Sequence, residues 1–394
     1  MSVVAEAGAV SRVEAGSADT ALLPRDDLSR DVYCVLGIPV DAIEMATTLQ
    51  RIHAAADRGA PYLISTPNLN FLVKSLSDER FRESLIASDL CTADGMPIVW
   101  ISRFLGIPIR ERVAGSDVLE ALAATGRPEN PLRLFLFGGD AGVAATAGAA
   151  LNARAGGLRS VGALSPGFGS VEDMSEARVL DAINASDANF LIAAIGAGKG
   201  QEWLVRNHHR IRVPVRVYLG AALNFAAGTV KRAPSRLRKS GFEWVWRIVQ
   251  EPGLWTRYFR DGLVLLRLLL GSVLPLCCLR VVRAVKSPLA ASRFALRQFE
   301  NEDLVVVEIA GPANRAHFDD ISAAFRKALR GSKPLVIDFT RATDIDARIL
   351  GLILMLRKVA RADRRSVVLR GVSLRLAWIM RLNRAGFLVS EARL

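Results

Sequence analysis

The chain has 394 residues, a length that allows two or three domains with cores of their own. Hydrophobic residues make up 51% and charged residues 23%, and this composition excludes a chain that is disordered throughout. The net charge of +13 points to an anionic partner, and the position of the excess charge decides which kind.

Residues 1–30 are predicted to form a flexible leader, because they are rich in Ala, Gly, Ser and Glu. The segment lacks a basic stretch followed by an apolar core, so it does not resemble a signal peptide. The four cysteines show no CxxC spacing, and two of them are adjacent at Cys277 and Cys278. We therefore expect reduced thiols, a cytosolic setting and no zinc site.

Residues 31–230 alternate between apolar strand-like runs and helix-like stretches rich in Ala and Leu. The strand candidates are DVYCVLGIPV, PYLISTPN, LRLFLFGG, NFLIAAIG and VRVYLG. This alternation predicts an α/β domain, with a Rossmann-like, mostly parallel sheet and helices on both faces. In such sheets the ligand crevice lies outside the carboxyl ends of the strands.

Polar residues follow several of these runs. Asp94, in ADGMPIVW, stands between apolar segments, where burial can raise the pKa of a carboxyl group toward that of a general base. The alternative is an ordinary Asp-Gly turn. Thr66 and Asn68, in STPN, can bind hydroxyl or phosphate groups, or cap the next helix. Arg112 and Asp117, in ERVAGSD, add a further charged pair.

Two glycine-rich turns follow other strand candidates. Gly138 and Gly139 suit a phosphate-approaching turn, but the pattern is not GxGxxG and does not support a dinucleotide site. The turn IGAGKGQEW begins at Gly196 and brings Lys199 with it. Backbone approach, a cation and an amide suit a nucleotide diphosphate, although a surface turn with a solvated lysine remains the alternative.

Residues 231–290 hold most of the excess charge. Between Lys231 and Arg293 there are thirteen Lys or Arg residues against three acidic residues, a local net charge of +10. Aromatic residues accompany these charges, and residues 262–282 are strongly apolar. Their length allows a membrane span, but Arg267 interrupts the run and Pro275 is expected to break the helix. The segment predicts a basic amphipathic appendage on an anionic membrane surface, with no nucleic acid as partner.

Residues 295–394 read as a small α/β domain. Three strands are expected in DLVVVEIAG, KPLVIDFTRATDID and RSVVLRGV, and helices are expected after each. About a hundred residues is a common domain size.

The motifs TPN…F, ADGMPIVW, ERVAGSD, FLFGG, IGAGKGQEW, GAALNFAAGTVKRAP and GFEWVWRIVQEP…RYF occur in an order that resembles the WecG/TagA/CpsF family of bacterial glycosyltransferases. The resemblance covers roughly residues 33–260. It implies inverting transfer of a sugar, without a cofactor, from a nucleotide-sugar donor to an acceptor. The donor is typically a UDP-sugar such as UDP-N-acetylmannosamine, and the acceptor is a polyprenyl-diphosphate-linked sugar. It also implies a peripheral location on the cytoplasmic face of the inner membrane.

The resemblance also suggests roles for single residues. Asp94 matches the general base, with Thr66 and Asn68 beside it. The predicted donor-binding residues are Gly138, Gly139, Gly196, Lys199, Gln201, Glu202 and Asn224. The residues predicted to meet the diphosphate or the membrane are Arg232, Arg247 and Arg257. Two positions depart from the family pattern, Asn224 where an acid is usual and Gly198 where proline is usual.

The C-terminal domain resembles a STAS domain, the fold of anti-sigma-factor antagonists. Where that family carries a phosphorylatable serine after an aspartate, this chain has Ala347 and Arg348 after Asp346, so a phosphoswitch is not expected there. A protein-binding or regulatory module and a domain kept for packing both remain open. The alternative function is a membrane-bound scaffold whose transferase site has decayed and which acts through this domain.

Overall fold

The computed structural model describes residues 23–286 and 293–390, apart from residues 155, 168, 221, 235, 236, 239 and 240. Most of the predicted leader, residues 1–22, lies outside this range. The prediction of a flexible leader is wrong for its last residues, because Asp27–Ser29 forms a 3₁₀ helix and both Leu28 and Arg30 are buried.

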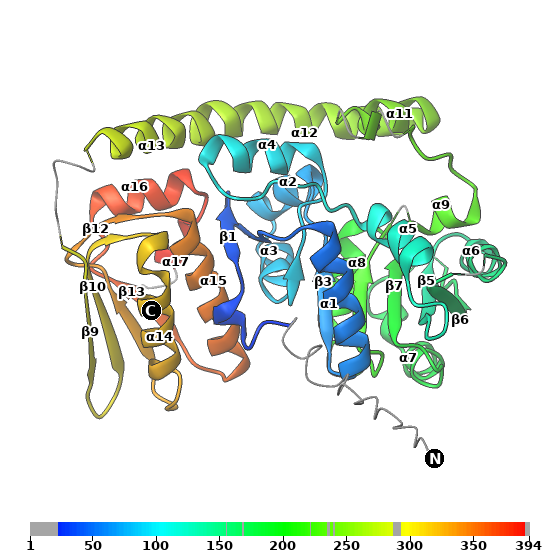
Figure 1. The fold of residues 1–394 in the computed structure, drawn as a ribbon, viewed down its shortest axis with the longest axis horizontal. Coiled ribbons are helices and arrows are strands. Elements are labelled where there is room, and N and C mark those ends of the chain that lie inside the picture. Colours follow the sequence, from blue (N-terminus) through cyan, green and yellow to red (C-terminus); the bar gives the residue numbers. More distant parts are fainter. Residues whose placement is uncertain are drawn as a thin grey trace, which may run out of the picture.

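The predicted parallel sheet is confirmed (Figure 1). Six strands lie in the order β4-β3-β8-β7-β5-β6, and every neighbouring pair is parallel. The strands are β3 (Tyr62–Ser65), β4 (Leu90–Cys91), β5 (Leu132–Gly138), β6 (Leu158–Leu164), β7 (Phe190–Ala194) and β8 (Val215–Tyr218). The helices are α1 (Met45–Arg58), α2 (Leu69–Ser77), α3 (Glu79–Ile86), α4 (Met96–Leu105), α5 (Gly115–Thr125), α6 (Val143–Asn152), α7 (Ala177–Asn184), α8 (Ala197–Arg206) and α9 (Ala222–Ala227).

The first strand candidate does not belong to this sheet. It forms an antiparallel hairpin of β1 (Val32–Val35) and β2 (Ile38–Asp41). The two loop residues, Leu36 and Gly37, both have positive φ, 48° and 92°, as is usual in the tight two-residue turns of β-hairpins. All eight strand residues are buried, so the run has the uniform apolar character of a central parallel strand and conceals the turn.

The appendage consists of α11 (Glu243–Gln250), α12 (Trp255–Leu268) and α13 (Leu274–Lys286). A π-helical turn, Leu269–Val273, joins α12 to α13, so the expected break at Pro275 is wrong. The extra residue of a π turn accommodates the missing N–H and the bulk of the proline ring. The helical segment Pro252–Ala284 is long and apolar enough to cross a membrane. Here it runs along the protein, over α2 and α4 (Figure 1).

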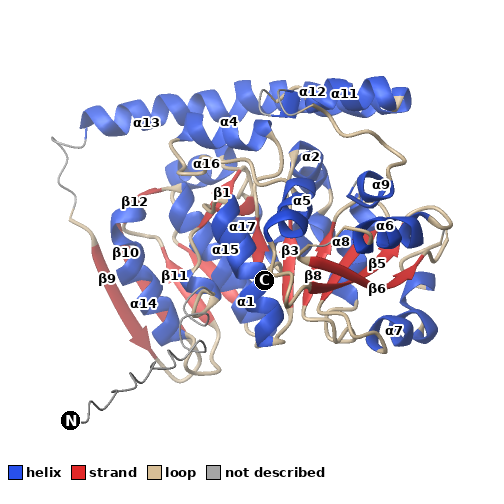
Figure 2. Ribbon diagram, turned by 45° about the vertical axis from the view of Figure 1, so that its right-hand side comes forward, coloured by secondary structure: helices blue, strands red, loops and turns tan. Residues whose placement is uncertain are grey.

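The second sheet belongs to the STAS-like domain, and Figure 2 labels its strands β9 to β12. The strand order is β12-β10-β11-β13, with β9 antiparallel to β10. The strands are β9 (Ala295–Glu300), β10 (Val305–Ala313), β11 (Leu335–Asp338), β12 (Ala342–Ile345) and β13 (Val367–Arg370). The helices are α14 (Phe318–Ala328), α15 (Ala347–Ala362), α16 (Leu374–Leu382) and α17 (Phe387–Ser390). The single strand expected in KPLVIDFTRATDID is two strands, because Asp338 accepts hydrogen bonds from Thr340 and turns the chain.

The hydrophobic core of the C-terminal domain extends into the β1–β2 hairpin and α3. Leu28, Val32, Cys34 and Ile86 pack in the same cluster as the residues of β10, β11 and α15. Helix α15 is buried on nearly all sides, because its own sheet covers one face and the β1–β2 hairpin contacts another. The hairpin therefore belongs to both folding units.

Candidate active site

The three predicted catalytic residues come together where β3 and β4 end. The backbone N–H of Asp94 donates to the carbonyl of Pro67 at 2.8 Å, which joins the two loops. A Cβ atom on Gly95 would lie 3.8 Å from the Cβ of Asn68. Thr66 is buried, and Asn68 caps α2 by accepting a hydrogen bond from the N–H of Phe71 at 3.1 Å. The capping alternative therefore holds for Asn68, at a position beside Asp94.

The carboxyl group of Asp94 is set in a poorly solvated position at the start of α5. The N–H of Gly115 donates to its Oδ2 atom at 3.4 Å. Burial raises the pKa of Asp94 to about 7, the positive charge of Arg112 opposes this shift, and the negative charge of Glu243 adds to it. A carboxyl group that is half ionised near neutral pH is suited to act as a general base.

Charged residues from distant segments surround this carboxyl group. Arg112 forms ion pairs with Asp117 and with Glu243, the latter at 3.1 Å. Glu243 comes from α11, so the appendage contributes a side chain to the surroundings of Asp94. Glu243 stands in the motif GFEWVWRIVQEP, but the sequence interpretation gave it no role, because its partner Arg112 is more than a hundred residues away.

The three predicted appendage arginines have different surroundings. Arg232 forms ion pairs with Asp117 and Glu120, so its charge is already compensated within the protein. Arg247 pairs with Glu251 at 3.4 Å. Within the described part of the chain, Arg257 forms no ion pair, and its guanidinium lies 5.2 Å from the ring centroid of Tyr258.

Two of these arginines lie near the middle of the sheet edge. Burial raises the pKa of Tyr218 to about 12, and the charges of Arg257 and Arg247 oppose the shift. Tyr218 ends β8, which separates the Asp94 side of the edge from the glycine side. Arg257 and Arg247 are therefore the predicted appendage arginines whose charges act on Tyr218, at the middle of the sheet edge.

The glycine turns form the other side of the crevice. The N–H of Gly139 donates to the carbonyl of Ala194 at 3.0 Å, which ties the ends of β5 and β7 together. Gly138 has a φ of 114°, and a Cβ atom there would lie 2.5 Å from the Ala194 carbonyl oxygen. At Gly196 the space around a Cβ atom is open. Bare backbone is thus presented at the ends of both strands, as the phosphate-approaching interpretation requires.

The remaining predicted donor residues are less uniform. Lys199 is exposed and donates to the carbonyl of Gly169 at 2.9 Å, Glu202 is exposed, and Asn224 is half-buried on α9. Gln201 is fully buried instead of facing the crevice. Its Nε2 atom donates to Ser65 Oγ at 2.7 Å, so in this structure the side chain ties α8 to β3. The sequence held one sign of this burial: Gln201 stands three residues before the apolar Leu204, so both side chains share one face of α8.

The glycine at position 198 has a structural reason. A Cβ atom there would lie 2.1 Å from the Nζ atom of Lys74. The lysine of α2 therefore occupies the space that a side chain at position 198 would fill. The sequence interpretation did not single out Lys74, which adds a cation beside the first turn of α8.

A parallel sheet with a general-base candidate on one side of its carboxyl edge and bare glycine turns on the other has the layout of a ligand-binding site in α/β enzymes. Residues 33–276 match the model of the glycosyl transferase WecG/TagA/CpsF family, and residues 297–389 match the Mlab, STAS domain model. The chain belongs to the WecG/TagA/CpsF family and is a glycosyltransferase with a STAS-like domain. The family match extends past the expected residue 260 and includes most of the long appendage helix.

Three curated relatives carry the name N-acetylglucosaminyldiphosphoundecaprenol N-acetyl-beta-D-mannosaminyltransferase. The protein of Bacillus spizizenii is 27% identical over 209 residues, which is 53% of this chain and 78% of the relative. The protein of Bacillus subtilis is 25% identical over 50% of this chain and 74% of its own length. The protein of Staphylococcus aureus strain MW2 is 24% identical over 57% and 86%.

Proposed function

We propose that this protein transfers a hexose, of the N-acetylmannosamine type or a related sugar, from a UDP-sugar to a polyprenyl-diphosphate-linked saccharide. The names of the relatives support the type of sugar transferred and the class of the acceptor. The observation that carries the proposal is the carboxyl group of Asp94, which has a pKa of about 7 at the junction of β3, β4 and α5. The product belongs to the biosynthesis of a surface polysaccharide.

In the proposed reaction, Asp94 accepts the proton of the acceptor hydroxyl group. The hydroxyl oxygen attacks the anomeric carbon of the donor as the bond from that carbon to the UDP oxygen breaks, and UDP leaves. A single displacement of this kind inverts the anomeric centre. The leaving diphosphate gains negative charge, which positioned cations stabilise. Arg257 is the best placed, because no carboxylate among the described residues compensates it, and Arg247 lies near the same tyrosine.

The outer surface of the appendage supports peripheral binding to the membrane. Large apolar side chains recur every three or four residues along α12 and α13, so they share one face of the helix. The exposed members are Trp255, Phe259, Leu263, Leu266, Leu270 and Leu274. Leu268 and Asp261 are buried on the opposite face, against the protein. Such a face, beside exposed Arg260 and Arg267, suits the interface of an anionic bilayer and a lipid-linked acceptor.

The test is the release of UDP from a panel of UDP-sugars, with and without an N-acetylglucosaminyl-diphosphate-polyprenol acceptor. We expect release that depends on the acceptor and is greatest with one donor. Folded protein that releases no UDP from any donor and binds none of them would contradict the proposal. That result would favour the scaffold alternative instead.

A further inference from the structure

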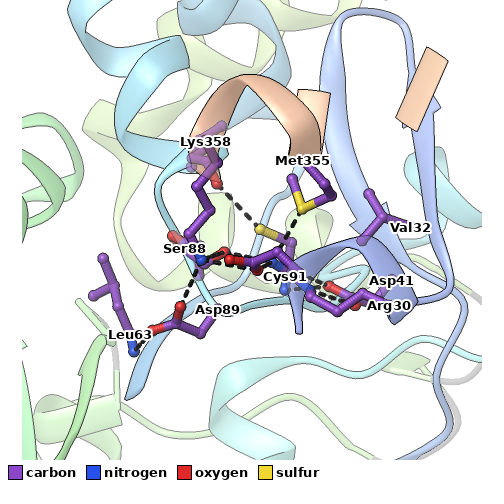
Figure 3. Close-up of polar contacts among 12 residues, drawn as sticks. Arg30, Val32, Asp41, Leu63, Ser88, Asp89, Cys91, Met355 and Lys358 are labelled. Atoms are coloured by element: carbon purple, nitrogen blue, oxygen red, sulfur yellow. Dashed lines mark hydrogen bonds and ion pairs between the residues drawn. The ribbon is translucent and has the colours of Figure 1, made fainter. Parts of the chain in front are cut away.

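Buried charges that the proposed reaction does not use lie between the glycosyltransferase part and the STAS-like domain (Figure 3). Arg30 and Asp41 form an ion pair of 2.8 Å, and only 2% of each side chain is exposed. Arg30 also donates to the carbonyl of Ser88 at 2.8 Å and contacts the sulfur of Met355, on α15, at 3.2 Å. Because removing one partner of a buried ion pair is costly, this geometry is strongly held.

A lysine from the STAS-like domain completes the group. The Nζ atom of Lys358, on α15, lies 2.5 Å from Asp89 Oδ1 and 3.0 Å from Asp27 Oδ1. The other carboxylate oxygen of Asp89 accepts the N–H of Leu63 at 2.7 Å. Lys358 therefore holds the residue that precedes β4 in its contact with β3.

Strand β4 depends on such outside support. It has two residues, lies at the edge of its sheet, and pairs with β3 only at Ile64–Leu90 and Ser65–Cys91. The N–H of Cys91 is bound by Asp41 Oδ2 at 2.7 Å. Asp94 follows three residues later, so an error in the position of β4 passes directly to the proposed base.

The start of α15 is also committed to the glycosyltransferase part. Arg348 donates from Nη1 to the carbonyls of Arg30, at 2.9 Å, and Val32, at 2.8 Å. A Cβ atom on Gly351 would lie 2.3 Å from the Val32 carbonyl oxygen, so helix and hairpin touch along their backbones. Ala347, at the position of the phosphorylatable serine of other STAS domains, is thus next to Arg348, which joins the two domains through these hydrogen bonds.

We propose that the STAS-like domain has the glycosyltransferase part of its own chain as its partner, and that it braces β4 so that Asp94 is correctly placed. Lys358 is a positioning residue for this purpose. The inference rests on the proposed role of Asp94. On this proposal, the STAS-like domain neither binds a separate partner nor serves for packing alone. It holds β4, and through β4 the proposed base, in position.

The test uses the full-length chain with Lys358→Met, Lys358→Arg and the control Lys333→Met. Lys333 pairs with Glu300 at 2.9 Å inside the STAS-like domain, so its loss leaves the brace intact. We expect Lys358→Met to lower kcat by about tenfold or more, with the donor KM unchanged within about twofold, because small displacements of a reacting group are expensive. Lys358→Arg should recover most of kcat, and Lys333→Met should match the wild type. An unchanged kcat in folded Lys358→Met would overturn the inference.

Hydrogen exchange separates this inference from the proposed function, since it needs no turnover. The amides of Thr92 and Asp94 are bonded to the carbonyls of Ser65 and Pro67. We expect about tenfold faster exchange at residues 89–95 in Lys358→Met and no change in Lys333→Met. Equal protection in all variants would contradict the brace, whether or not the wild type releases UDP.

A second variant tests the same contact by insertion. Gly351→Val places a side chain against the carbonyl of Val32, whereas Gly331→Val enters open space in the same domain. The first should accelerate exchange at residues 89–95 and the second should not. Should Gly351→Val prevent folding, the Lys358 variants decide the question alone.

Discussion

The two sides of the sheet's carboxyl edge are built in different ways. At the ends of β3 and β4, side-chain charges from α5, α11 and the loop before α5 surround Asp94. At the ends of β5 and β7, the wall is glycine backbone with open space beside Gly196. In the proposed reaction, the first side holds the base and the second side holds the phosphorylated donor. The proposed base side therefore depends on charges from distant segments, and the proposed donor side depends on local backbone shape.

The strongest way to break the comparison is Asp94→Asn. We expect kcat to fall by about a thousandfold while donor KM changes little, because the amide cannot accept the hydroxyl proton. Asp57→Asn, which removes an exposed ion pair of α1, is the control and should leave kcat unchanged. A parallel loss of donor binding would show that Asp94 is structural.

The same variant has a stability signature. Because burial raises the pKa of Asp94 from its ordinary value to about 7, the folded state holds a proton that the unfolded state releases between those pH values. This carboxyl group therefore costs stability progressively as pH rises toward 7. Asp94→Asn should show a higher Tm than the wild type at pH 8, with a smaller difference at pH 5. A lower Tm at pH 8 would contradict the assigned burial of this group.

Arg257→Ala compared with Arg232→Ala separates free from compensated cations. Loss of Arg257, which forms no ion pair with any described residue, should lower kcat by about a hundredfold, a usual effect of removing one stabilising donor for a developing negative charge. Loss of Arg232 leaves Asp117 less neutralised near Asp94, so its main effect should be a higher pKa in the pH–rate profile. Equal effects on kcat and unchanged pH profiles would show that ion pairing does not distinguish the two residues.

Gly138→Ala tests the shape of the donor side. Its Cβ atom would meet the Ala194 carbonyl at 2.5 Å, whereas Gly142→Ala has the same positive sign of φ but open surroundings. We expect donor KM to rise about tenfold for Gly138→Ala and less than about threefold for Gly142→Ala, measured by UDP release. Similar values for both would remove the close approach of β5 and β7 from the account.

The smallest expected effect on chemistry comes from Trp255→Ser with Phe259→Ser. Binding to anionic vesicles should fall by about tenfold or more, as the loss of two buried apolar side chains predicts. Activity on a water-soluble acceptor analogue should stay constant. Phe299→Ser removes an exposed aromatic side chain of β9, away from the appendage, and should leave vesicle binding unchanged. Equal vesicle binding by the wild type, the double variant and Phe299→Ser would contradict the proposal that this face of the appendage meets the membrane.

Sequence patterns predicted the parts of the fold that local periodicity encodes. The parallel sheet and the glycine turns followed from strands that end in polar or small residues, whereas the family resemblance suggested that Asp94 lies beside Asn68. The β1–β2 hairpin did not, because a fully buried run shows no alternation. Edge strand β6 was missed because it is half exposed and weakly apolar.

Long-range relations had no local signal. The pairing of Arg112 with Glu243 and the contact of Lys358 with Asp89 join segments more than a hundred residues apart. Gln201 is a similar case. Its local sequence fits both a predicted donor-binding loop and a buried helix face, and only the hydrogen bond to Ser65 distinguishes the two. The types of residue at the candidate site could therefore be predicted from the sequence. Their ion-pair partners and their burial could be seen only in the structure.

The measurement that tests the central claim most directly is the pH dependence of kcat/KM for acceptor-dependent UDP release by the wild type. A base with a pKa of about 7 must be ionised to act, so the rate should be constant above that pH. Below it, the rate should fall about tenfold for each pH unit. A rate that stays constant down to pH 5 in folded protein would contradict the assignment of Asp94 as the general base.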